Sequence, residues 1–366
     1  MLSPVELAVP GARSLQPYQP GKPSEELERE YGIQHAVKLA SNENPLGPSS
    51  LALKALTKAG PTFARYPDGN SFALKRALAE RLKLRASQIT LGNGSNEILE
   101  LVARTFVSSS DEVVFSQHAF VVYPLVTQSI GASGIVVPAK NWGHDLEAMA
   151  EAVTACTKMV FIANPNNPTG TWVTSSQLEK FLTAMPDHVL VVVDEAYFEY
   201  VAEPAYPNCI QWVEHFPNLV VTRTFSKAYG LAGLRVGWGV SSSEIADLMN
   251  RVRQPFNVSS AAQTAALAAL QDEDHIEKSV TLNAAQMARL QQALPAMGLS
   301  VIPSVGNFVC VDVGRSAAQV YEALLHEGVI VRPVDNYGLP NHLRITVGLL
   351  EENDRLISAL ARALGR

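Results

Sequence analysis

The sequence has few cysteines, no excess of positive charge and no long apolar run. Its 366 residues include three cysteines, Cys156, Cys209 and Cys310, far apart and in no Cys-x-x-Cys pair. This spacing predicts buried free thiols rather than a disulfide framework or a thiolate metal site. Lys and Arg number 29 against 35 Asp and Glu, so little counterion release is available to drive binding to nucleic acid. We therefore expect no nucleic-acid partner.

Signals for a membrane, for export and for zinc are missing as well. The longest strongly apolar run, residues 189–193, is far shorter than the ~20 residues that span a bilayer. The first residues, MLSPVE, contain no basic segment followed by an apolar one, as an export signal requires. The eight histidines include no His-Glu-x-x-His pair, so we expect no metal site. These absences predict a cytoplasmic protein without a membrane partner.

What is present indicates an α/β protein with a core of normal size. Hydrophobic residues make up 47% of the chain, and its length suggests about two domains. Short β-branched runs alternate with helical patterns, which favours a mostly parallel sheet covered by helices. We expect strands at residues 89–91, 112–115, 134–137, 159–162, 189–193, 219–222 and 236–239. Helices are expected at 72–84 and 95–106, with Asn70-Ser71 and Ser95-Asn96 as side-chain caps.

The pattern changes after residue 255 and predicts a second, smaller α+β domain. An Ala-rich helical region at 259–294 is broken near 272–274. Strands at 308–311, 329–331 and 343–347 and helices at 316–327 and 351–364 follow. We divide the chain into an N-terminal arm (1–40) that joins the small domain, a large domain (41–255) and the small domain (256–366).

Residues 222–235, TRTFSKAYGLAGLR, suit an aldehyde that carries a phosphate. Lys227 follows a predicted strand, Thr224 and Ser226 precede it, and Arg235 lies eight residues beyond it. Hydroxyls and a guanidinium can hold a phosphate dianion, and a lysine in a dry cleft can lose its proton and attack a carbonyl. By itself, this segment fits an exposed lysine on a turn equally well.

Two more predicted strands end in polar side chains. Asp194 and Tyr197 follow the buried run 189–193, and Asn167 lies in the Pro-containing loop 163–170 after another strand. Ligands gather beyond the carboxyl ends of parallel strands, where a carboxylate can keep a pyridine nitrogen protonated and a phenol can bond a ring oxygen. Taken singly, Asp194 would pass as a helix cap and the loop as a plain turn.

A glycine-rich turn, Gly92-Asn93-Gly94-Ser95-Asn96, leads into the helix predicted at 95–106. Free amides at a helix start suit a phosphate. Glu97 stands where a dinucleotide-binding motif requires its third glycine, so NAD is weakly supported.

Together and in this order, the four motifs resemble the fold-type I aminotransferases that use pyridoxal 5′-phosphate (PLP), over essentially the whole chain. Within that superfamily the nearest resemblance is to the histidinol-phosphate aminotransferase family. It rests on residues 15–23 (LQPYQPGKP), 38–48 (KLASNENPLGP), 65–69 (RYPDG) and 343–348 (LRITVG). The resemblance implies a fold-type I PLP-dependent transferase, with a large PLP-binding domain built on a mostly parallel mixed sheet and a smaller α+β domain.

The resemblance also implies a role for each motif residue. Lys227 would carry PLP as a Schiff base, Asp194 would pair with the pyridinium nitrogen, and Tyr197 would bond the 3′-oxygen. The other cofactor-binding residues would be Ser95, Asn96, Thr224, Ser226 and Arg235 at the phosphate, Asn167 at the 3′-oxygen and Tyr123 stacked on the ring. Arg344 would clamp a substrate carboxylate, and Tyr18, Asn44 and Arg332 would line the substrate pocket, the last of them near a substrate phosphate.

Finally, the resemblance implies a homodimer in which Tyr66 reaches the phosphate of the neighbouring subunit's cofactor. The reaction implied is a reversible transfer of an amino group from L-glutamate to imidazole-acetol phosphate, giving L-histidinol phosphate and 2-oxoglutarate, with small-molecule donor and acceptor. One stretch departs from the family. Many members have Pro-Thr-Tyr or Pro-Ser-Phe before the stacking tyrosine, whereas residues 117–123 here are QHAFVVY, which changes the pocket wall.

Four other functions stay open at this stage. An aromatic or broad-specificity aminotransferase would share the scaffold, and so would a PLP-dependent phosphoamino acid decarboxylase, because the motifs do not separate loss of an α-proton from loss of an α-carboxylate. A PLP-sensing regulator would need a DNA-binding module, for which the N-terminal arm is too short. An NAD-dependent oxidoreductase would lack visible absorbance.

Overall fold

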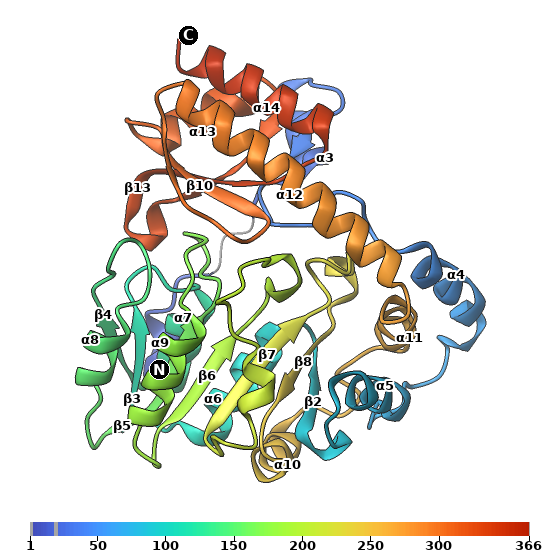
Figure 1. Ribbon diagram of the computed structural model, residues 1–366, viewed down its shortest axis with the longest axis vertical. Helices are drawn as coiled ribbons and strands as arrows, with labels where there is room; N and C mark the ends of the chain where they lie inside the picture. The colour runs from blue at the N-terminus through green and yellow to red at the C-terminus, as the bar shows by residue number, and fades with distance from the viewer. Residues whose placement is uncertain (1–2, 18–20, 366) are drawn as a thin grey trace.

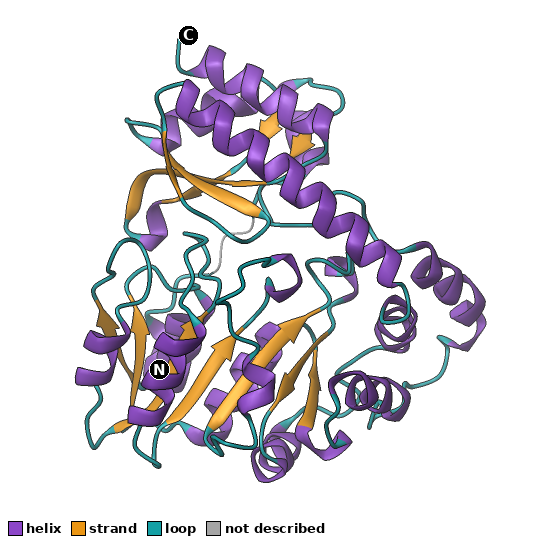
Figure 2. Cartoon of the chain, in the orientation of Figure 1, coloured by secondary structure: helices purple, strands orange, loops and turns teal. Residues whose placement is uncertain are grey.

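The structure, a computed structural model, describes residues 3–17 and 21–365 of the chain. Figure 1 shows a large body built on one central sheet, with a smaller layered body above it that contains the C-terminus. Figure 2 shows helices on both sides of the large sheet, while the small body has helices over a sheet. This is the predicted α/β architecture.

The central sheet has seven strands in the order β2-β8-β7-β6-β5-β3-β4. All neighbours are parallel except β8, which is antiparallel to both β2 and β7. The mostly parallel mixed sheet is therefore confirmed. The strands are β2 (Ile89–Gly92), β3 (Glu112–Ser116), β4 (Ser133–Val137), β5 (Thr157–Ala163), β6 (Leu190–Asp194), β7 (Leu219–Thr224) and β8 (Gly237–Val240).

Helices cover this sheet because each has one apolar side. In α6 (Ser95–Phe106), for example, Ile98, Leu99 and Val102 are fully buried. The other helices of the large body are α4 (Ser50–Ala59), α5 (Phe72–Leu82), α7 (Val122–Ile130), α8 (Leu146–Glu151), α9 (Ser175–Ala184), α10 (Ser243–Val252) and α11 (Ser260–Ala269). Two apolar clusters fill the spaces between helices and sheet.

The small body has a four-stranded antiparallel sheet in the order β12-β13-β10-β9. Its strands are β9 (Ser300–Ile302), β10 (Phe308–Asp312), β12 (Arg332–Val334) and β13 (Leu339–Thr346). The long helix α12 (Glu273–Ala296), α13 (Ala317–His326) and α14 (Leu350–Ala363) accompany it, and one apolar cluster joins these helices to the sheet. The break predicted near 272–274 is confirmed, since α11 ends at Ala269 and α12 begins at Glu273.

The N-terminal segment contacts both bodies. Its elements are α1 (Pro4–Leu7), α2 (Pro10–Arg13), α3 (Ser24–Tyr31) and β1 (Val37–Lys38). Strand β1 pairs with β11 (Val329–Ile330) of the small body, and Leu27 of α3 is fully buried against Leu325 and Ile330. In contrast, Ser14 accepts a hydrogen bond from Gln128 of α7 at 2.8 Å.

The domain boundaries stay a prediction, and the packing of one helix bears on them. Helix α11 lies within the range assigned to the small domain, yet Ala262 and Ala265 belong to the same apolar cluster as Leu74 and Leu78 of α5. Figure 1 shows α11 beside α4 and α5, at the lower end of α12.

The predicted side-chain caps are wrong. Ser71 adopts a left-handed conformation and caps nothing; instead Asp68 Oδ2 accepts from the backbone N–H of Phe72 at 2.7 Å. Helix α6 begins after Gly94, with no side chain bonded to its first amides. Those amides therefore stay available for an anion.

Candidate active site

A cavity of about 190 Å³ lies where the predicted chemistry should be, beyond the ends of β5, β6 and β7. The small body and the N-terminal segment close it. Its walls contain the following predicted residues: Ser95, Asn96, Asn167, Asp194, Tyr197, Thr224, Ser226, Lys227, Arg235, Arg332 and Arg344. Residues from all four sequence motifs and from the C-terminal segment thus meet at one place, as parallel strand ends do.

Asp194 is the last residue of β6 and is 5% exposed. Its Oδ1 accepts from the hydroxyl of Thr222 at 2.9 Å, and its Oδ2 accepts from the hydroxyl of Tyr123 at 3.1 Å. Burial raises the pKa of Asp194 to about 6, against the lowering effect of these two hydrogen bonds. The carboxyl is still an anion near neutral pH, so it can pair with a protonated ring nitrogen.

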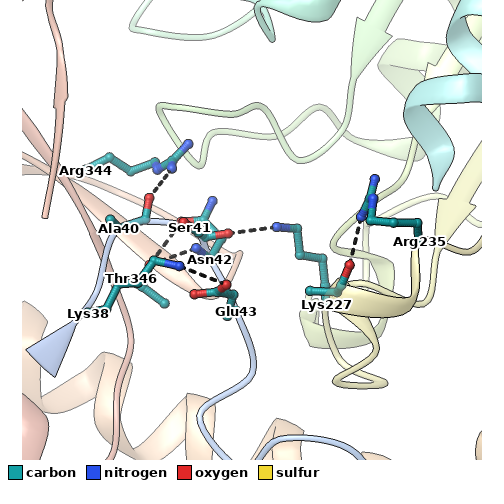
Figure 3. A network of polar contacts seen from close by, with 10 residues as sticks. Lys38, Ala40, Ser41, Asn42, Glu43, Lys227, Arg235, Arg344 and Thr346 are labelled. Atoms are coloured by element: carbon teal, nitrogen blue, oxygen red, sulfur yellow. Dashed lines mark hydrogen bonds and ion pairs between the residues drawn. The ribbon is translucent and has the colours of Figure 1, made fainter. Parts of the chain in front are cut away.

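Lys227 lies three residues beyond the end of β7, and it lines the cavity. Its Nζ donates to the backbone carbonyl of Ser41 at 3.0 Å (Figure 3). Burial, followed by the positive charge of Arg344, lowers the pKa of Lys227 to about 7. Because an unprotonated amine is the nucleophile, this lysine is poised to attack a carbonyl near neutral pH.

Positive and donor groups converge at a second end of the cavity. Nη1 of Arg235 donates to the hydroxyl of Ser226 at 3.2 Å, and the uncapped start of α6 adjoins both residues in the cavity wall. A Cβ on Gly94 would lie 2.3 Å from Nη2 of Arg235, and one on Gly237 would lie 2.4 Å from the amide nitrogen of Ser95. Glycine at both positions lets the backbone and the guanidinium surround a small dianion.

Arg344 enters the cavity from β13 of the small body. Its Nη1 donates to Asn167 Oδ1 at 2.7 Å and its Nη2 donates to the carbonyl of Ala40 at 2.6 Å (Figure 3). Its Nε is buried without a hydrogen-bond partner among the described residues. Arg332 lies opposite Arg344 in the β12–β13 register and also lines the cavity. Two guanidinium groups therefore line one small space, which favours anionic substrates.

The hydroxyl of Tyr197 is held by two amides. Asn42 Nδ2 donates to it at 2.9 Å, and Asn167 Nδ2 donates to it at 3.2 Å. The sequence interpretation missed Asn42, although it lies in residues 38–48, the segment quoted for the family resemblance. It named Asn44 instead, which donates to the carbonyl of Ala228 and to the hydroxyl of Ser279 and is not part of the cavity wall.

Tyr123 does not occupy the position expected of a ring that stacks on a cofactor. It is 0% exposed, and its ring lies flat on Phe161, with centroids 4.6 Å apart and an interplanar angle of 2°. Its hydroxyl donates to Asp194 Oδ2. Phe120, three residues earlier, lines the cavity instead. The two aromatic residues are only three positions apart in the sequence. Which of them lines the cavity depends on the packing of the folded protein.

Of two further predicted residues, one cannot be placed and the other, Tyr66, is not in the cavity wall. Tyr18 falls outside the described residues, so its place in the substrate pocket stays a prediction. Tyr66 is 83% exposed and stacks on Phe256, with ring centroids 4.8 Å apart.

The fold and this site place the chain in one family. Residues 34–360 match the family described as aminotransferase class I and II. The chain belongs to this family.

Named relatives match nearly the whole length of the chain. Histidinol-phosphate aminotransferase 1 of Nitrosococcus oceani is 60% identical over 98% of this chain and 97% of its own. Histidinol-phosphate aminotransferase 2 of Pseudomonas aeruginosa is 57% identical, over 98% of each chain. Among solved structures, the histidinol-phosphate aminotransferase of Sinorhizobium meliloti in complex with pyridoxal-5′-phosphate superposes with a TM-score of 0.90 at 32% identity, over 98% of this chain and 97% of that one. The predicted fold is confirmed.

Proposed function

We propose that this chain is a PLP-dependent aminotransferase that moves an amino group between L-glutamate and imidazole-acetol phosphate, giving L-histidinol phosphate and 2-oxoglutarate. The observation that carries the proposal is that Lys227, Asp194 and Arg344 line one cavity. The chemistry of PLP transamination needs an amine, an anion for the ring nitrogen and a carboxylate clamp. The names of the full-length relatives support the substrates.

The cavity fits PLP at each of its functional ends. The amides at the start of α6, Ser226 and Arg235 would hold the phosphate, within the space that the missing Cβ of Gly94 leaves. Asp194 would hold the proton on the pyridine nitrogen, and Lys227 would bind the aldehyde carbon. Bound PLP supplies an electron sink for the charge that develops at the substrate α-carbon.

Proton transfer falls to Lys227. With substrate bound, its Nζ would be the base that accepts the proton leaving the α-carbon. A pKa of about 7 suits this role, because a base works best when its pKa is near the working pH. Tyr197 and Asn167 would bind the 3′-oxygen, and Phe120, which lines the cavity, would pack against the ring.

Arg344 and Arg332 would divide the recognition of substrate. Arg344, with a buried Nε that has no partner among the described residues, would clamp the carboxylate of glutamate. Arg332, on the neighbouring strand, would bind the phosphate of histidinol phosphate. With both arginines, the same site would bind glutamate in one half-reaction and histidinol phosphate in the other.

Single-turnover absorbance tests this function. Histidinol phosphate, glutamate, phenylalanine and phosphothreonine are added separately to the PLP-loaded protein, and loss of the visible band is timed. We expect histidinol phosphate and glutamate to convert the band fastest, with the amine form of the cofactor accumulating. Fastest conversion by phenylalanine would identify an aromatic aminotransferase, and release of carbon dioxide from phosphothreonine would identify a decarboxylase.

An Arg332→Gln variant separates phosphate recognition from the rest of the chemistry. It should raise the KM for histidinol phosphate about tenfold or more, since one charged hydrogen-bonding pair is lost, and leave the KM for histidinol, which has no phosphate, unchanged. Equal changes for both compounds would contradict the phosphate role.

The homodimer is part of the proposal. Apolar side chains that are more than a third exposed lie in α4, in the segments on either side of it, at the start of α5 and in the loop before α11: Leu46, Leu51, Leu53, Phe63, Tyr66, Phe72 and Phe256. Such a surface favours burial against a second copy. Tyr66 would then reach the cofactor phosphate of the partner subunit.

Mixing two inactive variants tests the shared site. Tyr66→Ala and Lys227→Ala proteins, dissociated and reassociated together, should regain part of the activity, because one site of each hybrid dimer has both residues intact. No recovery in a mixture shown to contain hybrid dimers would contradict the shared site. The cytoplasmic location stays a prediction; in residues 3–17 and 21–365 no helix is long and apolar enough to cross a membrane.

A further inference from the structure

Asn42 holds a constrained position between the two bodies of the protein. It is 1% exposed, lines the cavity, and has a φ of 54°, a left-handed conformation that asparagine tolerates better than most residues. Figure 3 shows it in the segment that passes between Arg344 on one side and Lys227 on the other.

The backbone of Asn42 is tied to the small body. Its N–H donates to the hydroxyl of Thr346 at 2.9 Å, and its carbonyl accepts from Asn307 Nδ2 at 3.0 Å. The hydroxyl of Thr346 in turn donates to Asn42 Oδ1 at 3.3 Å. Thr346 ends β13, and Asn307 immediately precedes β10. The orientation of the amide is thus fixed by the small sheet.

The free end of that amide reaches into the large body. Asn42 Nδ2 donates to the hydroxyl oxygen of Tyr197 at 2.9 Å, and Asn167 Nδ2 donates to the same oxygen at 3.2 Å. A phenol oxygen has two lone pairs, and both are taken up when it accepts two N–H groups. Its own proton must therefore point away from the two amides. The direction left is the cavity that Tyr197 lines.

We propose that Asn42 is a positioning residue, which directs the proton of Tyr197 toward the ring oxygen of the cofactor and couples this hydrogen bond to the placement of the small body. The proposal rests on the proposed function, in which Tyr197 faces that oxygen. Donors on a hydroxyl oxygen also strengthen the hydrogen bond that the hydroxyl donates. Asn42 therefore makes Tyr197 a better donor than the phenol would be alone.

The effect of neighbouring groups on the pKa of Tyr197 agrees with a role of Asn42 in making Tyr197 a better donor. Burial raises the pKa of Tyr197 to about 12, while the charge of Arg344 and the hydrogen bond from Asn42 both lower it. Among the described residues, no anionic side chain accepts the Tyr197 proton, so the proton stays available to a ligand.

Two substitutions separate the amide from the backbone of residue 42. Asn42→Gly removes the donor and keeps the positive φ and both backbone hydrogen bonds, because glycine adopts that conformation freely. Asn42→Asp keeps the shape and replaces the donor with an acceptor that takes the Tyr197 proton for itself. Asn44→Ala serves as a control, because it removes a buried amide from the same loop at a position outside the cavity wall.

The measurement is a pH titration of the visible absorbance of the PLP-loaded protein, which reports protonation at the cofactor without turnover. A weaker hydrogen bond from Tyr197 leaves the cofactor oxygen more basic, so the midpoint should rise. We expect a rise of about 0.5 to 1 pH unit for Asn42→Gly, at least as much for Asn42→Asp, and none for Asn44→Ala. Thermal unfolding of each variant shows that it is folded.

A double-mutant cycle with Tyr197→Phe decides the mechanism. If Asn42 acts through the Tyr197 hydroxyl, Tyr197→Phe alone raises the midpoint, and Asn42→Gly adds nothing to it. An unchanged midpoint in Asn42→Gly, or additive shifts in the double variant, would overturn the inference while leaving the proposed function intact. An unchanged midpoint in Tyr197→Phe would overturn both, since Tyr197 would then not face the cofactor.

Discussion

Gly94 and Arg235 approach each other so closely that no side chain fits between them. A Cβ on Gly94 would lie 2.3 Å from Nη2 of Arg235, and Gly94 also has a φ of 78°. The guanidinium therefore lies against the backbone at the start of α6, where the helix amides are uncapped. Two features of the proposed phosphate site that are far apart in the sequence therefore meet in space.

Gly94→Ala should weaken the binding of PLP about tenfold or more, because Arg235 must move away from the helix start and a charged hydrogen bond to the phosphate is lost. Equilibrium titration of cofactor-free protein with PLP measures the effect. Gly233→Ala is the control: a Cβ there meets nothing within 4 Å, and it should bind PLP normally. Equal affinity of the two variants would contradict the phosphate role of this corner.

Substitution of Lys227 should change stability in a pH-dependent way. The folded protein holds the pKa of Lys227 at about 7, against an ordinary value of 10.5, so the unfolded chain binds more protons than the folded chain between these two values. Stability therefore rises with pH from about 7 to 10.5, and the cost of the buried charge is complete below pH 7.

Cofactor-free Lys227→Met should accordingly be more stable than the parent at pH 6, with the difference shrinking as the pH rises toward 10. Urea unfolding of both proteins across this range is the measurement. The same variant cannot form a Schiff base with PLP, so it should lack the Schiff-base absorbance and show no transamination. A stability difference that does not depend on pH would mean that the amine is not desolvated as the structure indicates.

Tyr123 and Phe120 have different roles in the structure, so we expect different effects from their substitution. Tyr123→Phe keeps the ring that lies on Phe161 and removes only the hydroxyl that donates to Asp194. The pKa of Asp194 should rise further, because a hydrogen bond that stabilises its charge is lost, and PLP should bind about tenfold more weakly. If Tyr123 instead stacked on the cofactor, this substitution would change little.

Phe120→Ala is the companion variant. It leaves Asp194 and its partners in place and removes the ring in the cavity wall, so it should alter the position or shape of the visible band and weaken PLP binding. Visible absorption and circular dichroism of the loaded protein are the readouts. An unchanged spectrum would contradict packing of Phe120 on the cofactor.

Beneath the site, Glu195 and Arg223 form an ion pair that is almost fully buried, with side chains 0% and 5% exposed. Nε and Nη2 of Arg223 donate to Glu195 Oε2 at 2.9 and 2.7 Å. Arg223→Met should lower the free energy of unfolding by about 3 to 5 kcal/mol, because it leaves the Glu195 charge buried without its partner. Urea denaturation measures this.

Adding Glu195→Gln to Arg223→Met should restore part of the stability, since the uncompensated charge is then removed. Arg251→Met is a useful control. Both side chains of its ion pair with Asp247 are exposed. Loss of this pair should therefore lower the free energy of unfolding by less than about 1 kcal/mol. Equal costs at the buried and the exposed pair would contradict this account.

Much of the fold was predictable because local patterns agreed with tertiary packing. The apolar side of residues 95–106 predicted α6 at its observed bounds, and the buried β-branched runs predicted β5, β6 and β7 to within two residues at either end. The caps failed because a Ser or Asn near a helix start does not reveal its own φ: Ser71 is left-handed, and Asp68 takes its place.

For the site, the sequence by itself determined the chemistry. Lys227, Asp194 and Arg235 follow strands or turns whose ends must meet at one edge of a parallel sheet, so their proximity follows from the topology. Only the tertiary structure decided which neighbouring side chains line the cavity: Asn42 rather than Asn44, and Phe120 rather than Tyr123. Each choice lies between similar residues two or three positions apart. Contacts with the small body place Asn42 at the cavity, and packing on Phe161 holds Tyr123 away from it. Such long-range contacts cannot be predicted from a local sequence pattern.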